Sequence, residues 1–319
     1  MAHMIEMIDG KAQMAYAGDL PWHGLGTKVP ADVTPRQMLE AAGLDWNVDL
    51  YPAYADVAGK KIYSGRSMLV RNTDNKVLDT VGDDWKPVQN DEAFNFFNDF
   101  IGAGDMEMHT AGSLRDGQIV WGLAKVKDSF ELFGGDQVDS YLLFTNPHKY
   151  GQSIDVRFTP IRVVCNNTLT LSLSQKANQM VKVSHRQQFD GDRVKEMLGV
   201  AKEKLVSYKE MAGYLGSKRY TNESIVEYFQ RVFPVLTQKQ DSTKELSKSA
   251  QTALDIMDQQ PGAEYAEGSW WQAFNAVTFM TDHVIGRNAD NRLQSAWYGA
   301  NKNLKIKALE TAVEMAEAA

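Results

Sequence analysis

The chain has 319 residues, 43% of them hydrophobic and 24% charged, so it can bury a substantial core and has the composition of a soluble globular protein. Its formal net charge of −7 argues against a protein that coats nucleic acid without discrimination. No run of about 18 uninterrupted apolar residues occurs, which predicts no transmembrane span and no membrane partner. The first ten residues lack a secretory leader, and a single cysteine, Cys165, excludes a disulfide framework, so we expect a cytoplasmic protein.

The N-terminal part begins with a turn-rich segment at residues 19–30, where Trp22 is predicted to anchor an arm against the main domain. Thr34 then caps a helix that ends at Gly43. Residues 46–57 and 62–72 alternate like two strands joined by a turn, and residues 77–81 read as a third strand. A helix follows over residues 91–102, with Phe94 and Phe97 on one apolar stripe.

Residues 106–114 and 118–126 have the pattern of a hairpin, closed by a turn at residues 115–117. Strands at residues 138–146 and 153–164 continue an antiparallel meander, and residues 180–185 add a short strand. Helical spacing then recurs over residues 192–215, 222–233, 243–259, 270–285 and 293–317. We therefore expect an α+β fold: a mainly antiparallel sheet with helices in residues 1–190, and a helical region in residues 191–319.

The positive charge is concentrated in residues 155–219, which hold 12 lysines and arginines against 6 aspartates and glutamates. Arg157 and Arg162 lie in the strand at residues 153–164, and their spacing places them on opposite faces unless a bulge at Pro160 returns both to one side. Asn166 and Asn167 are suited to cap a following helix. One interpretation is an anion site at this strand end. The other is that the arginines pair with carboxylates and the asparagines only cap.

The known catalytic motifs are missing from the sequence. Phosphate-loop, zinc-protease, serine-hydrolase and calcium-loop patterns do not occur, and the six histidines are scattered at spacings that no metal site uses. We therefore expect neither cofactor nor metal, and the sequence favours a protein without catalytic activity. An enzyme that uses Arg157, Arg162 and Asn166 on a phosphate-bearing substrate remains an alternative.

Several segments in a fixed order resemble the phage/plasmid-like protein family that carries the domain of unknown function 932. They are PWHGLG (21–26), AGLDW (42–46), PVQN (87–90), TAGSL (110–114), TPIRVVCNNTL (159–169), WQAFNAVT (271–278), Asp282 with His283, Arg292, and WYG (297–299). The resemblance spans nearly the whole chain and implies a protein of phages, plasmids and laterally moved bacterial genes. It implies no activity, because the family has none assigned.

These observations favour single-stranded nucleic-acid binding, with strand annealing in phage DNA metabolism and recombination as the specific hypothesis. The basic segment carries aromatic residues between its cations, and rings of this kind stack on unpaired bases. The predicted contacts are Arg157, Arg162, Asn166, Asn167, Lys176, Lys182 and Arg186. Single-stranded DNA is the expected partner, and self-association is expected because annealing proteins work as rings or filaments. The alternative is an accessory or counter-defence protein that binds a host protein or a nucleotide, which the acidic remainder of the chain favours.

Overall fold

The computed structural model describes residues 5–19, 21, 24–127, 130–162, 167–168, 180–235, 246–286, 292, 295–296 and 299–318. The chain divides into two compact units. Unit 1 comprises Met1–Lys127, Tyr141–Phe158 and Met180–Ala201, and unit 2 comprises Asp128–Ser140, Thr159–Gln179 and Lys202–Ala319. Strands β11 (Gln137–Pro147) and β12 (Ile154–Arg162) and helix α4 (Gly191–Ser217) have residues in both units. The division into a sheet domain, residues 1–190, and a helical region that packs on it, residues 191–319, stays a prediction.

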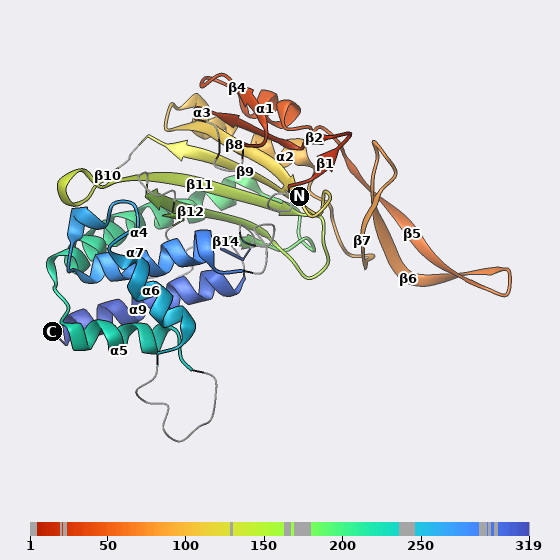
Figure 1. The fold of residues 1–319 in the computed structure, drawn as a ribbon. Helices are drawn as coiled ribbons and strands as arrows, with labels where there is room; N and C mark the ends of the chain where they lie inside the picture. Colours follow the sequence, from red (N-terminus) through yellow and green to blue (C-terminus); the bar gives the residue numbers. More distant parts are fainter. Residues whose placement is uncertain are drawn as a thin grey trace. The chain divides into compact units, whose positions relative to one another are not determined.

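Unit 1 is built on a sheet whose strands come from distant parts of the sequence (Figure 1). Its order is β4 (Thr27–Val29), β3 (Met14–Ala17), β8 (Met106–Leu114), β9 (Ile119–Val126), β11, β12 and β14 (Met180–Val183). The pairs β3–β8, β8–β9, β9–β11 and β12–β14 are antiparallel, while β3–β4 is parallel. Two short strands, β1 (Met7–Ile8) and β2 (Lys11–Ala12), form a separate antiparallel pair.

Three helices pack beside this sheet. Helix α1 (Pro35–Ala41) starts at a capping box between Thr34 and Gln37 and packs on β3 and β8. The predicted helix over residues 91–102 is two short helices, α2 (Asn90–Asn95) and α3 (Asn98–Gly102). Phe96 and Phe97, at the break between them, are both buried.

A second sheet of unit 1 has the order β5 (Val48–Val57), β6 (Lys60–Arg71) and β7 (Val77–Gly82), all antiparallel. Strands β5 and β6 form a long hairpin that extends beyond β7 (Figure 1). Its turn is Ala58–Gly59, both with positive φ, as the tight turn of a twisted hairpin requires. We call residues 49–66 of this hairpin the arm.

Unit 2 is largely helical. Its helices are α4, α5 (Asn222–Val232), α6 (Lys248–Met257), α7 (Trp270–Phe279) and α9 (Ala300–Glu317), with 3-10 helices at Phe133–Gly135 and Ala263–Ala266 and a π-helix at Met280–Val284. Helix α7 is central, because its residues 270–278 are all buried and it packs on α6 and α9. Strand β10 (Phe130–Glu131) pairs with β11, and β13 (Asn167–Thr168) pairs with β12 and lies against α7.

The predicted fold class is confirmed: a mainly antiparallel sheet with helices in the N-terminal part, followed by helices. Asn167 lies in β13 as the register partner of Arg162 in β12. The helix that Asn166 and Asn167 are suited to cap falls on residues outside those that the structure describes, so it stays a prediction.

Candidate nucleic-acid interface

The structure separates the predicted contact residues. Arg157 is 8% exposed and its Nε lies 3.3 Å from an Asp155 carboxylate oxygen, so this arginine is engaged inside unit 1. Arg162 and Asn167 are placed by their backbones, as register partners in β12 and β13. Asn166 and Lys176 lie outside the described residues, as do Trp22 and Cys165.

Two of the predicted contacts are exposed in unit 1. Lys182 lies on β14 in register with Asp155, and Arg186 follows in the next turn. Arg186 Nε lies 3.2 Å from Asp84, with both side chains more than half exposed, so this pair contributes little to stability. These two cations are accessible to an anionic partner.

The arm is the largest exposed apolar feature of the described residues. Every arm residue except Ala53 is exposed, on both strands and therefore on both faces of the ribbon. A two-stranded ribbon in water has little reason to display large side chains unless they meet a partner. The exposed large residues on it are Leu50, Tyr51, Tyr54, Val57, Ile62 and Tyr63, at 38–55% exposure.

Two tyrosines of the arm form an aromatic pair. Tyr54 and Tyr63 are register partners in β5 and β6, and their ring centroids lie 5.8 Å apart. The Tyr63 hydroxyl donates to Asp83 beyond the end of β7, and Ser67 Oγ donates to the same carboxylate at 2.8 Å. This bond raises the pKa of Tyr63 and lowers that of Asp83. Asp83 therefore holds the ring in one orientation.

Cations lie on the same hairpin as these rings. Lys60 and Lys61 follow the arm turn, and Arg66 lies with its guanidinium carbon 4.9 Å from the centroid of the Tyr150 ring, which is itself 55% exposed. Arg66 also donates to the Thr80 carbonyl at 3.0 Å, which fixes its position over the ring. A planar cation on an exposed ring is an arrangement that can bind both phosphates and bases.

The base of the arm is held by a buried ion pair. Arg71, at the end of β6, is 1% exposed and donates to Glu6 at 2.8 Å and to both carboxylate oxygens of Asp74, at 2.9 and 2.6 Å. Ser113 donates to the second oxygen of Glu6 at 2.8 Å, and the guanidinium carbon lies 5.2 Å from the Trp46 ring. The arm thus projects from a fixed, hydrogen-bonded base.

Two neutral histidines are buried elsewhere in unit 1. His148 shares a hydrogen bond of 2.9 Å with Asn90, and burial lowers its pKa to about 3. His185 stacks on Trp85 with centroids 4.0 Å apart, and burial lowers its pKa to about 4. Both rings are uncharged at neutral pH, so they are packing groups of unit 1 that acid would charge.

A family model of a domain of unknown function matches residues 77–297, more than two thirds of the chain. The chain belongs to the DUF932 family. No curated protein and no solved structure matches it. The family match begins at the first residue of β7, so β5 and β6 precede it, whereas the sheet of unit 1 from β8 onward lies inside it.

Two sequence segments that carry the DUF932 resemblance meet in unit 2. Strand β13, from the segment 159–169, lies against α7, which contains the segment 271–278. Directly after α7, Asp282 in the π-helix accepts a hydrogen bond of 2.9 Å from Lys305 of α9, whose side chain is fully buried. The two segments that carry the DUF932 resemblance therefore pack together at α7 of unit 2.

Among the described residues, no group of three or more His, Cys, Asp or Glu side chains is placed to hold a metal ion. In the same part of the chain no helix is long and apolar enough to cross a membrane. The sequence analysis predicts the strands of the arm but does not identify the arm as a binding surface. The strand pattern does not say whether another element covers these residues.

Proposed function

We propose that this DUF932 protein binds single-stranded nucleic acid in the cytoplasm, with the arm as its main contact surface. The observation that carries the proposal is the exposed Tyr54–Tyr63 pair on the arm, whose turn is followed directly by Lys60 and Lys61. Unpaired bases stack on aromatic rings while nearby cations neutralise phosphates, so such a surface prefers single strands over duplexes. The two rings are tilted by 59° to each other and both side chains are exposed, so ring surface is accessible to bases.

The predicted basic segment supplies the rest of the proposed path. Lys182 and Arg186 are exposed cations of unit 1, and Arg162, Asn166, Asn167 and Lys176 stay predicted contacts. Phosphate contacts position a strand without reading its sequence. The resemblance to phage- and plasmid-type proteins supports annealing as the role of this binding, with self-association of the chain on the strand.

The first prediction tests the tyrosine pair. The double variant Tyr54→Leu/Tyr63→Leu keeps apolar bulk but removes both π-faces, so its affinity for labelled oligothymidylate falls by about 10- to 100-fold, the share of one stacked base at roughly 1–3 kcal/mol. Fluorescence anisotropy over a series of salt concentrations measures it. The wild-type slope of log affinity against log salt should be about −0.7 for each phosphate contact.

The matched control is Val57→Ala, which removes an exposed aliphatic side chain from the same arm. Its affinity for oligothymidylate should equal that of the wild type, because an aliphatic side chain offers no stacking face. Equal affinities of the tyrosine variant and the wild type would contradict the proposal.

A second candidate function is docking of a protein partner on the arm. The observation that favours it is the exposure of Leu50, Val57 and Ile62, three aliphatic side chains with no use in base stacking. The core of a protein interface is typically rich in aliphatic and tyrosine side chains and poor in charged ones. In that case, wild-type binding to oligothymidylate would be as weak as that of the tyrosine variant.

A further inference from the structure

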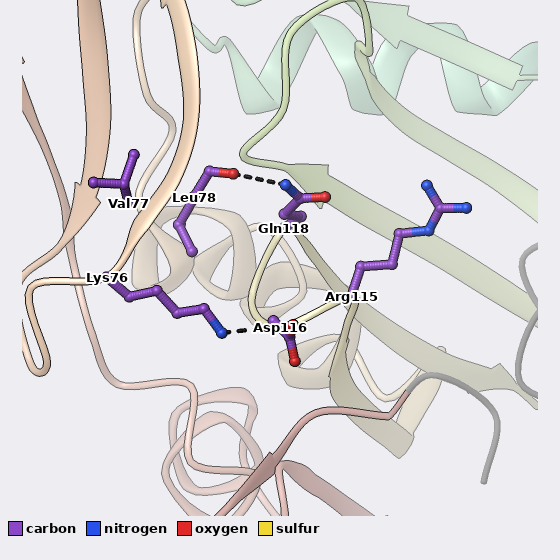
Figure 2. A pocket seen from close by; sticks show the side chains of 6 residues that line it. All are labelled: Lys76, Val77, Leu78, Arg115, Asp116 and Gln118. Atoms are coloured by element: carbon purple, nitrogen blue, oxygen red, sulfur yellow. Dashed lines mark hydrogen bonds and ion pairs between the residues drawn. The ribbon is translucent and has the colours of Figure 1, made fainter. Parts of the chain in front are cut away.

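A pocket of about 410 Å³ lies near the base of the arm, at the start of β7. Its lining residues are Lys76, Val77, Leu78, Arg115, Asp116 and Gln118, all in unit 1. The volume falls in the range of small-molecule sites and is large enough for one nucleotide. Figure 2 shows the Lys76 ammonium and the Arg115 guanidinium on opposite sides of Gln118.

The pocket carries more cations than anions. Lys76 and Arg115 line it, and Lys149 donates to Gln118 Oε1 at 3.0 Å. The lining carboxylate is Asp116, whose side chain is 76% exposed and lies 3.7 Å from Lys76. Glu6, 4.0 Å from Lys76, is already paired with Arg71. The excess of positive charge favours an anionic ligand.

Arg115 has an unused donor. Its Nε is buried and has no hydrogen-bond partner among the described residues. A buried N–H without an acceptor costs free energy, so an acceptor supplied by a ligand would be stabilising. An arginine fork matches the oxygens of a phosphate better than a single point charge does.

The backbone of this turn is strained. Arg115 and Asp116 both have positive φ, 53° and 57°, a region that side chains other than glycine avoid. Gly117 completes the turn because a Cβ there would lie 2.9 Å from Arg71 Nη1. The turn joins β8 to β9, and successive positive φ values are what a tight hairpin turn requires, so the turn fixes the backbone from which Arg115 projects.

A chain of contacts links the pocket to the arm. Arg66 of the arm lies over Tyr150, whose chain neighbour Lys149 reaches Gln118 of the pocket. The Tyr150 backbone N–H donates to Asp79 of β7 at 2.9 Å, which fixes this link. These contacts connect Arg66 of the arm to the pocket lining through two neighbouring residues, all within unit 1.

We propose that this pocket binds a nucleotide phosphate monoester, either the terminal phosphate of a strand or that of a free mononucleotide. For the terminal phosphate of a strand this inference rests on the proposed function, whereas for a free mononucleotide it does not. A phosphate monoester carries up to two charges at neutral pH, whereas each phosphodiester inside a strand carries one, so a multi-donor pocket prefers the monoester.

The test compares oligothymidylate of one length with a 5′-phosphate, a 3′-phosphate or hydroxyl ends, by anisotropy at fixed salt. The strand with one of the two phosphorylated ends should bind the wild type about tenfold more tightly than the strand with hydroxyl ends, the share of one charge-assisted hydrogen bond.

Arg115→Asn should abolish this preference, and asparagine is chosen because it tolerates positive φ. Lys149→Gln should reduce it without touching the turn. Arg36→Gln, an exposed arginine paired with Glu40 on α1, should keep it.

Calorimetric titration with thymidine 5′-monophosphate, and with inorganic phosphate, is the second experiment. Binding of the mononucleotide that Arg115→Asn abolishes, without any preference among strand ends, assigns the pocket to a free nucleotide. If the wild type shows no preference among strand ends and does not bind the mononucleotide, the pocket proposal is wrong. If the wild type does not bind the strand with hydroxyl ends, the proposed function of the arm is wrong. The pocket is then tested by the calorimetric titration.

Discussion

Replacing Arg71 with methionine should lower the free energy of unfolding by about 3–5 kcal/mol, the usual cost of breaking a buried ion pair by removing one partner. Arg71 is 1% exposed and pairs with Glu6, which is 2% exposed. Methionine fills much of the same volume but offers Glu6 no donor, so a carboxylate is left buried with Ser113 as its remaining close donor. Urea denaturation followed by tryptophan fluorescence measures the change.

The control is Arg66→Met, an exposed arginine five positions earlier on the same strand. It should cost under about 1 kcal/mol, as exposed polar contacts usually do. The double variant Glu6→Leu/Arg71→Met should recover much of the loss, because no charge is then left buried. Equal stabilities of Arg71→Met and Arg66→Met would show that the pair does not hold the base of the arm.

The elements of the arm could be predicted from sequence, but its exposure could not. Alternating residues identify β5 and β6 as strands, and Ala58–Gly59 marks their turn. Whether a strand is covered depends on what packs against it, which is a tertiary fact. Likewise, Arg71 meets Glu6 across 65 positions of sequence, and no local pattern records such a pairing.

The candidate site illustrates the same limit. Arg157 and Lys182 looked alike in the sequence as cations of one basic segment. In the fold, Arg157 is engaged with Asp155 inside unit 1, and Lys182 is exposed on the edge of β14. A charge count describes a segment, whereas accessibility depends on which face of each strand is covered. This is why the proposed contact surface is centred on the arm and not on the basic segment alone.

Acid should destabilise unit 1 well before its ordinary carboxylates titrate. His148 and His185 have pKa values of about 3 and 4 in the fold, lowered mainly by burial, against about 6.5 in an unfolded chain. The unfolded state therefore binds their protons more tightly. Their contribution is complete above pH 6.5 and is lost as the pH falls from 6.5 toward 4. The slope is up to about 1.4 kcal/mol per pH unit for each histidine, so about 3 kcal/mol per unit for both.

The measurement is the unfolding free energy from urea titrations at several values between pH 7 and pH 4.5. His148→Gln keeps a donor for Asn90 and removes the titrating ring, so the slope should fall by about half; adding His185→Gln should remove most of the rest. Asp74 acts in a different window, because Arg71 holds its pKa below the usual range and its contribution is lost only at still lower pH. A slope between pH 6.5 and 4.5 that both histidine substitutions leave unchanged would mean that these rings already carry protons in the folded protein.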